Sequence, residues 1–259
     1  MITARSNPQL KALATLLRKR SAREEERVFV CEGKKMFFEI LSQHPKSLEK
    51  VYLSERGLAS LTEEEKERLA GCTFEIVSDE AFDAVAETVT PQGVLATVHM
   101  PEYSLSELLK GERARLLVLE RLQDPGNLGT ILRTAEAAGM NGVILSADSV
   151  DAFNPKVVRS TMGAILRVPF LYAEDWSAML DSLKSAGVTL YAAHLQGSVP
   201  YTEPCYGERC AILIGNEANG LTDETTAKAD VRVRIPMEGQ AESLNAAVAA
   251  AILMYRAVL

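Results

Sequence analysis

The sequence predicts an α/β protein, and three features of its 259 residues support this fold class. Apolar strand-like runs alternate with amphipathic helix-like runs almost from end to end. Hydrophobic residues make up 47% and charged residues 24% of the chain, as in ordinary globular proteins. No apolar stretch reaches the roughly 18 residues of a membrane span, and the N-terminus lacks the apolar block of an export signal. We therefore expect a globular cytoplasmic protein, with no membrane partner, of one or two domains.

The first hundred residues predict a small α/β domain, residues 1–100. Asn7 followed by Pro8 is a typical helix start, and the helix that runs on to Arg20 places four leucines on one face. These leucines are Leu10, Leu13, Leu16 and Leu17. Strands are expected at 28–33, 50–54, 73–78 and 93–100, and further helices at 34–43 and 62–70.

A polar linker, residues 101–113, leads to a second predicted domain, residues 114–259. Its strands are expected at 115–120, 141–146, 188–195, 210–217 and 231–237. Its helices are expected at 127–138, 154–165 and 243–259. Apolar strands at helix-length separations predict a parallel sheet that is covered on both faces.

The charge pattern and the cysteines indicate which ligands and cross-links to expect. The net charge is -7, yet residues 1–23 carry six Lys or Arg and no acidic residue. Such a stripe can bind a polyanion locally, or it can be a solvated helix face, and the charge pattern does not decide between them. The four cysteines form no CxxC pair and the three histidines are isolated. We therefore expect neither a disulfide framework nor a metal site.

Three loops follow predicted strands, at the sheet edge where open α/β sheets bind ligands. In the first, 124–133, Gly126 and Gly129 let the backbone approach a ligand closely. Asn127 can cap the following helix, and the guanidinium of Arg133 is suited to phosphate. Taken alone, this loop is better explained by Asn127 as an ordinary helix cap and Arg133 as a surface ion-pair residue.

The second loop, 214–221, has two glycines, Gly215 and Gly220, on either side of Glu217. In the third, 235–245, Ser243 is a candidate helix cap, and Asn245 is a poor helix former whose side chain needs a partner. An ordinary β-to-α turn is the alternative for the second loop, and a capped helix with a solvated Asn245 is the alternative for the third. The chain has no GxGxxG, Walker A or GxSxG motif, which disfavours a nicotinamide-dependent oxidoreductase.

Taken together and in this order, the three loops resemble the signature motifs of the SpoU/TrmH branch of the SPOUT RNA methyltransferases. The matching stretches are NLGTILRTAEAAG, LIGNEANGL and IPMEGQAESLNAAVA. The intervening FNPKVVRSTMGAILRVPF is similar to the family's middle segment. The N-terminal SNPQLKALATLLRKR and FVCEGKKMFFEIL look like the substrate-binding domain of the ribosomal-RNA members.

The resemblance implies a SPOUT-type parallel sheet with a trefoil knot, preceded by a small α/β RNA-binding domain. It implies a homodimeric enzyme that uses S-adenosylmethionine to methylate a ribose 2'-hydroxyl of RNA, with 23S-type ribosomal RNA favoured. A transfer-RNA 2'-O-methyltransferase and a non-catalytic RNA-binding protein on the same fold are the alternatives. A non-catalytic relative would be expected to lose Arg133, Glu217 or Asn245, and this chain has all three.

Site residues follow from the same resemblance. The catalytic set would be Arg133, Asn127, Glu217, Ser243 and Asn245. The cofactor set would be Gly215, Ile235, Leu244, Met237 and Gly220. RNA contacts are expected from Lys156, Arg159, Arg18, Lys19 and Arg20. Because a guanidinium is effectively never deprotonated in proteins, we expect Arg133 to clamp a phosphate and stabilise the developing alkoxide, while a phosphate oxygen or water takes the proton.

Overall fold

The computed structural model describes residues 1–259 and divides into two compact units. The first unit combines residues 1–101 with 153–163, and the second combines 102–152 with 164–259. The segment 153–163 therefore groups with the first unit, although the sequence suggested placing it in the second domain. No helix is both long and apolar enough to cross a membrane.

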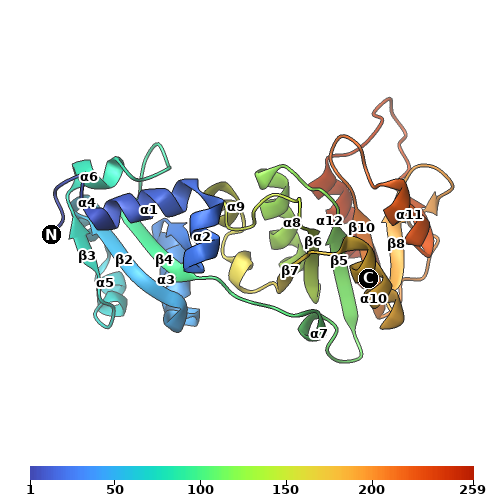
Figure 1. Ribbon diagram of the computed structural model, residues 1–259, viewed down its shortest axis with the longest axis horizontal. Coiled ribbons are helices and arrows are strands. Elements are labelled where there is room, and N and C mark those ends of the chain that lie inside the picture. Colours follow the sequence, from blue (N-terminus) through green and yellow to red (C-terminus); the bar gives the residue numbers. More distant parts are fainter. The chain divides into compact units, whose positions relative to one another are not determined.

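The first unit is a four-stranded mixed sheet, in the order β1-β4-β2-β3, with helices around it (Figure 1). Strand β4 is antiparallel to β1 and β2, whereas β3 is parallel to β2. The strands are β1 (Val28–Glu32), β2 (Leu48–Ser54), β3 (Glu75–Val77) and β4 (Val94–His99). The helices are α1 (Pro8–Arg18), α2 (Arg20–Glu26), α3 (Lys34–Gln43), η1 (Pro45–Ser47), α4 (Glu55–Ala59), α5 (Glu63–Leu69), α6 (Asp79–Asp83) and α9 (Pro155–Ser160).

Helix α1 begins as the sequence predicts. Asn7 accepts a hydrogen bond from the backbone N of Gln9, and Pro8 occupies the first turn. The four leucines on the inner face are buried in the core beside strands β1, β2 and β4. One basic residue of the N-terminal stripe, Arg23, is also buried, and its guanidinium donates to the carbonyls of Leu16 and Leu17. Arg23 therefore serves the fold and is not part of the exposed basic surface.

The second unit is built on a seven-stranded sheet that is parallel throughout, as predicted, in the order β7-β6-β5-β10-β8-β11-β9. The strands are β5 (Ala114–Leu119), β6 (Gly142–Ser146), β7 (Phe170–Ala173), β8 (Thr189–Ala193), β9 (Val199–Pro200), β10 (Arg209–Ile214) and β11 (Val231–Arg234). The helices are α7 (Leu105–Leu108), α8 (Pro125–Ala137), η2 (Ala164–Leu166), α10 (Trp176–Ser185), α11 (Asp223–Lys228) and α12 (Ala246–Val258). The sequence prediction lacked β7, β9, α10 and α11.

The strand order reverses between β5 and β10, and this reversal positions the site. Strands β6 and β7 extend the sheet on the β5 side, while β8, β11 and β9 extend it on the β10 side. The pairing of β5 with β10 ends at Leu119 and Ile214. The loops that follow these two strands therefore leave the sheet side by side, at the kind of switch point where α/β sheets bind ligands.

Two predicted helix caps are wrong, and one predicted helix is shorter than expected. Helix α8 begins at Pro125 with Asp124 as its N-cap, which leaves the side chain of Asn127 free for another partner. Helix α12 begins at Ala246, and its N-cap is Asn245 instead of Ser243. The helix expected at 154–165 ends at Ser160, because Met162 and Gly163 take left-handed backbone angles that helices do not tolerate.

Candidate active site

Asn127 links all three predicted loops. Its Nδ2 donates to Glu217 Oε1 at 3.0 Å, and its Oδ1 accepts from Asn245 Nδ2 at 2.9 Å. Because Asn127 is only 9% exposed, losing either partner would leave a buried amide group unsatisfied. The loops after β5, β10 and β11 therefore meet at one place, as the sequence predicted.

The carboxylate of Glu217 fastens the second loop to the first. It accepts from the backbone N of Gln123 at 3.1 Å and of Asp124 at 2.9 Å, in addition to Asn127. Partial burial raises the pKa of Glu217, but these hydrogen bonds outweigh burial and hold the pKa below its usual value. A carboxylate that is ionised and already accepts three hydrogen bonds is suited to positioning the loops, not to transferring a proton.

The second loop closes on itself through backbone hydrogen bonds between Asn216 and Gly220, at 3.0 and 2.8 Å. Gly215 precedes this closed turn, and a Cβ at that position would lie 2.0 Å from the backbone carbon of Gly220. Gly220 itself has φ of +68°, in the left-handed region that favours glycine. Both glycines are therefore required by the shape of the turn.

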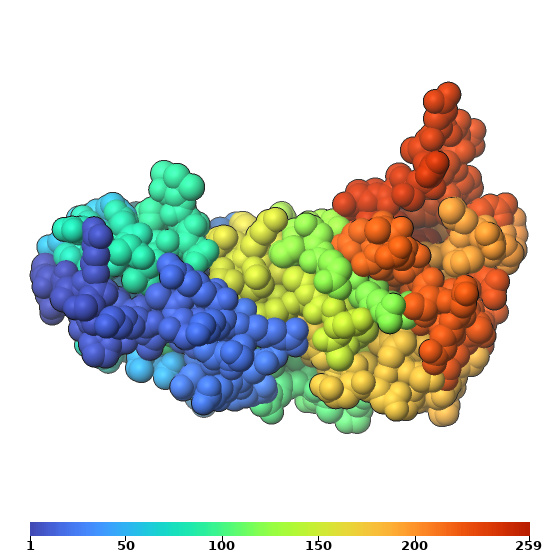
Figure 2. All heavy atoms as spheres, turned by 45° about the horizontal axis from the view of Figure 1, so that its top comes forward, coloured from blue at the N-terminus to red at the C-terminus, as the bar shows by residue number.

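A cavity of about 680 Å³ opens at the carboxyl ends of β8, β10 and β11. Its wall includes the five predicted cofactor residues, Gly215, Gly220, Ile235, Met237 and Leu244, together with Glu217 and Ser243. Figure 2 shows the chain after β11, in red, projecting from the surface of the second unit. A cavity of this volume lies within the usual range for sites that hold small molecules and cofactors.

Several lining residues were not predicted from the sequence. The turn after β8 contributes His194, Leu195 and Gln196. The sequence already placed a strand at 188–195, so the rule that ligands bind beyond strand ends could have identified this turn. Thr226 on α11 also lines the cavity, and no pattern in the sequence indicated it.

Two predicted catalytic residues stay outside the hydrogen-bond network. Arg133 is exposed on α8 and makes no hydrogen bond or ion pair. Ser243 is exposed in the loop before α12 and makes no hydrogen bond either. Arg133 therefore presents an unpaired guanidinium, the group best suited to binding a phosphate in two-point geometry.

The five predicted RNA-binding residues all lie in the first unit, and they differ in whether their side chains already have a charged or polar partner. Arg18, Lys19 and Lys156 are exposed and have no polar partner for their side chains. Arg20 pairs with Glu24 at 2.7 Å. Arg159 lies 3.6 Å from the buried carboxylate of Glu32. This places Arg159 among groups that hold α9 against β1.

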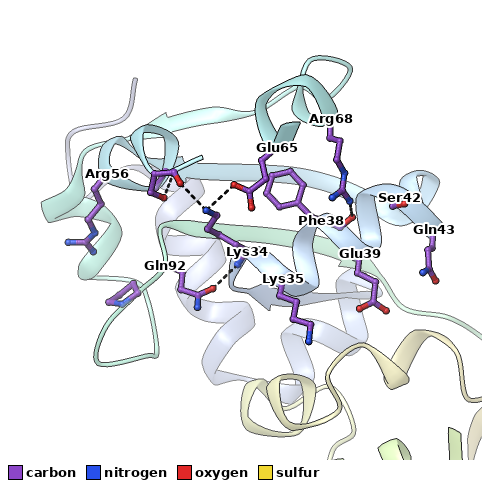
Figure 3. Close-up of a pocket in the computed structure, with 13 residues that line it drawn as sticks. Lys34, Lys35, Phe38, Glu39, Ser42, Gln43, Arg56, Glu65, Arg68 and Gln92 are labelled. Carbon is purple, nitrogen blue, oxygen red and sulfur yellow. Dashed lines mark hydrogen bonds and ion pairs between the residues drawn. The ribbon is translucent and has the colours of Figure 1, made fainter. Parts of the chain in front are cut away.

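The first unit has a cavity of its own, about 950 Å³, beside α3, α4 and α5 (Figure 3). The Lys34 ammonium is held there by Glu65 at 3.0 Å and by the carbonyl of Ser60 (Figure 3). Arg56 is paired with Asp83, and the guanidinium of Arg68 lies over the Phe38 ring. Most of the positive charge in this cavity is thus already engaged within the protein.

No group of three or more His, Cys, Asp or Glu side chains is placed to hold a metal ion. All four cysteines are free thiols.

Comparison with known proteins matches both parts of the chain. The model of the SpoU rRNA Methylase family matches residues 114–255, and that of the MRM3-like substrate binding domain matches residues 7–96. The chain is 43% identical over 180 residues to the 23S rRNA (guanosine(2553)-2'-O)-methyltransferase RlmP of Bacillus subtilis, a stretch that covers 70% of each protein.

Two solved structures resemble almost the whole chain. An AdoMet-bound rRNA methyltransferase from Sinorhizobium meliloti superposes with a TM-score of 0.85 at 31% identity, covering 99% of this chain and 96% of that one. The SpoU methyltransferase AviRb from Streptomyces viridochromogenes, in complex with the cofactor AdoMet, gives a TM-score of 0.86 at 27% identity, covering 97% of each chain.

Proposed function

The chain belongs to the SpoU rRNA methylase family, and from this premise we propose that it transfers the methyl group of S-adenosylmethionine to a ribose 2'-hydroxyl of 23S-type ribosomal RNA. The observation that carries the proposal is the contact of Asn127 with both Glu217 and Asn245. This contact brings the three motif loops together beside one cavity. A transfer-RNA substrate is the second candidate, which the mapping experiment at the end of the Discussion distinguishes.

The cavity suits S-adenosylmethionine in its chemistry. Ile214, Leu221 and Leu253 supply apolar surface. The backbone groups of Met237 and Leu244 make no hydrogen bond within the protein. Free main-chain donors and acceptors beside apolar side chains are what a flat, heteroatom-rich adenine ring requires. We assign the holding of the cofactor to Gly215, Gly220, Ile235, Met237 and Leu244.

S-adenosylmethionine supplies an electrophilic methyl group on a sulfonium when it is bound. The protein's part is to place the ribose hydroxyl in line with that methyl and to favour the charge that develops on its oxygen. We assign this electrostatic role to Arg133, whose free guanidinium can hold the neighbouring phosphate while it faces the developing alkoxide. The proton goes to a phosphate oxygen or to water, since Arg133 cannot accept it.

The remaining polar residues position the loops. Glu217 and Asn245 hold Asn127 from opposite ends of its amide. Asn245 also accepts from the backbone N of Ala247 and Val248, so the same side chain fixes the start of α12. We assign Ser243, which lines the cavity without a polar partner, to the loop that closes over the donor.

In this proposal the first unit binds the RNA. Arg18, Lys19 and Lys156 are exposed and unpaired, so they can bind phosphates without breaking an existing ion pair. Arg20 and Arg159 would first have to leave Glu24 and Glu32. A ribosomal-RNA substrate agrees with the cytoplasmic location expected from the sequence.

We further propose that the enzyme is a homodimer and that its C-terminal chain forms a trefoil knot. Val248 and Tyr255 of α12 and Leu259, which directly follows the helix, are 47%, 43% and 96% exposed and recur at helical spacing on one face. An exposed apolar strip of this kind is typical of a surface that a partner covers. For the knot, the support is that α12 follows β11 near one edge of the sheet yet packs on α8, β5 and β10 at its centre.

The proposal is tested by methyl transfer from radiolabelled S-adenosylmethionine to 23S ribosomal RNA, with digestion to locate the label on a ribose. We expect Arg133→Lys to lower kcat by about 100-fold, as removal of one transition-state contact does, while donor affinity stays unchanged. Arg113→Lys, at another exposed and unpaired arginine of the second unit, should leave kcat unchanged. Nearly full activity of Arg133→Lys would exclude the two-point role.

A further inference from the structure

Glu120, the residue directly after β5, has a carboxylate that is buried in the second unit. The residue is only 4% exposed and forms no ion pair. Its carboxylate instead accepts hydrogen bonds from the backbone N and the Oγ1 of Thr222, both at 2.8 Å, and from Thr225 Oγ1 at 2.6 Å. A buried carboxylate is costly unless such hydrogen bonds compensate for the lost solvation. All three donors belong to the start of α11, so Glu120 fixes this helix to the end of β5.

The residues that Glu120 holds belong to one wall of the cavity in the second unit. Thr222 directly follows the second motif loop, 214–221, and is the N-cap of α11. The cavity is lined on both sides of Thr222 in the sequence, by Gly220, Leu221, Asp223 and Thr226. Glu120 contacts this wall but does not itself line the cavity. An effect of Glu120 on a bound ligand must therefore pass through the wall.

The two ends of the second loop are anchored by different residues. Near its start, Asn216 Nδ2 donates to the carbonyl of Arg121 at 2.9 Å, and Glu217 accepts from the first loop. At its end, residues 220–222 have no hydrogen bond outside the loop and α11 except those that Glu120 accepts. Glu120 is thus the polar anchor for the end of the loop that faces the cavity.

We propose that Glu120 is a positioning residue for the methyl donor, an inference that rests on the proposed function. By holding Thr222, its carboxylate keeps Gly220 and Leu221 in place against the bound donor. The electrostatic role in methyl transfer is assigned to Arg133, which lies on α8 and has no contact with Glu120. Glu120 therefore acts on the affinity for the donor and not on the rate of the fully bound complex.

Two substitutions separate this role from a general effect on stability. Glu120→Gln keeps the size of the side chain but puts an NH2 group where an oxygen accepts a hydrogen bond. Asp230→Asn is the matched control, because Asp230 also accepts from a backbone N, that of Leu190 at 2.9 Å, and pairs with Lys184 at 2.8 Å. Asp230 precedes β11 and lies at the amino end of the strand, whereas the cavity lies at the carboxyl end.

Isothermal titration of the full chain with S-adenosylhomocysteine measures the affinity of the donor site. We expect Glu120→Gln to weaken binding about five- to tenfold, the usual effect of one lost hydrogen bond. Asp230→Asn should leave this affinity unchanged, although both substitutions should lower the urea midpoint. In methyl transfer to 23S ribosomal RNA, Glu120→Gln should raise KM for S-adenosylmethionine by a similar factor and leave kcat unchanged.

A second pair of substitutions tests the same contact from the other side and leaves the buried carboxylate in place. Thr222→Ala removes one of the three hydrogen bonds to Glu120, so we expect binding to weaken by about two- to fivefold. Thr222→Ser keeps the hydroxyl and should restore the wild-type affinity. This pair decides the question if Glu120→Gln does not fold.

Three results would overturn the inference. These are wild-type affinity for S-adenosylhomocysteine in Glu120→Gln or Thr222→Ala, an equal loss of affinity in Asp230→Asn, and a fall in kcat while KM for the donor stays unchanged. If the wild-type protein does not bind S-adenosylhomocysteine at all, the proposed function fails and the inference falls with it.

Discussion

Glu217→Gln changes one atom of the loop network and tests its electrostatics directly. The carboxylate accepts from Gln123 N, Asp124 N and Asn127 Nδ2 at 3.1, 2.9 and 3.0 Å. A glutamine oxygen can still serve two of these donors, but its NH2 then faces a third N–H. Hydrogen bonds to charged groups contribute about 1.5–3 kcal/mol, and solvent screens this carboxylate, which is only partly buried. We therefore expect the free energy of unfolding to fall by about 1–2 kcal/mol at pH 7.

The stability difference between wild type and Glu217→Gln depends on pH, and the pKa of Glu217 gives the direction of that dependence. The pKa of Glu217 is lowered in the folded protein, because its hydrogen bonds outweigh burial. The stabilisation is then fully present above the usual pKa of 4.5 and is lost as the pH falls through the lower folded-state pKa. The difference between wild type and Glu217→Gln should accordingly shrink below pH 4.5.

Urea unfolding measures this difference. The chain has a single tryptophan, Trp176, and it lies in the second unit, so its fluorescence reports on the unit that contains Glu217. Glu238→Gln, at an exposed glutamate without a partner, serves as control and should change nothing. An unfolding difference that is absent at pH 7, or that stays constant down to pH 3.5, would refute the role assigned to the Glu217 carboxylate.

Three further predictions follow from the structure. Gly215→Ala would place a Cβ 2.0 Å from neighbouring backbone. We therefore expect the free energy of unfolding, measured with urea, to fall by about 3 kcal/mol, and titration to show no binding of the methyl donor. Near-native values for both would contradict the requirement for glycine in this turn. Replacing Arg18 and Lys19 by Gln should reduce the steepness with which the logarithm of the RNA-binding constant falls with the logarithm of salt concentration by about 1.4, while the affinity for the methyl donor stays unchanged. An unaltered slope would show that these two residues do not belong to the RNA-binding surface. Tyr255→Glu should convert a dimer to monomer in light scattering, and a dimer that persists would place the interface elsewhere.

Local patterns predicted the elements that have strong periodicity. The four buried leucines of α1, the apolar runs of β5, β6, β8 and β10 and the alternating Val and Arg of β11 repeat at spacings that specify a helix face or a strand. Strand β9 has two residues and α11 has six, which is too short for a periodic pattern to emerge. Strand β7, with four residues, and helix α10, with ten, were missed although predicted elements are equally short or long.

The N-caps of α8 and α12 were predicted wrongly because each loop contains two residues that can cap the helix. Asp124 and Asn127 are both good N-caps, and Pro125 marks the first helical turn and thereby favours Asp124. Ser243 and Asn245 present the same ambiguity two residues apart. In the structure the side chains of Asn127 and Asn245 form a hydrogen bond with each other. This pairing depends on which strands are neighbours in the sheet.

The long-range contacts lay beyond any local pattern. Asn127 and Asn245 meet only because β10 lies beside β5 and α12 packs on α8. The segment 153–163 groups with the first unit, where α9 packs on β1 and Phe153 stacks against Phe29 at 5.0 Å between ring centres. The three motifs identified which residues gather at the site, and the strand order explains how they do so.

The central claim is tested most directly by deleting the gene and mapping ribose 2'-O-methylation across ribosomal and transfer RNA. We predict the loss of one 2'-O-methyl group in 23S-type ribosomal RNA, restored by the wild-type chain and not by Arg133→Lys. Loss in a transfer RNA alone would move the substrate to the second candidate. An unchanged set of ribose methyl groups in both RNA classes would contradict the proposed activity.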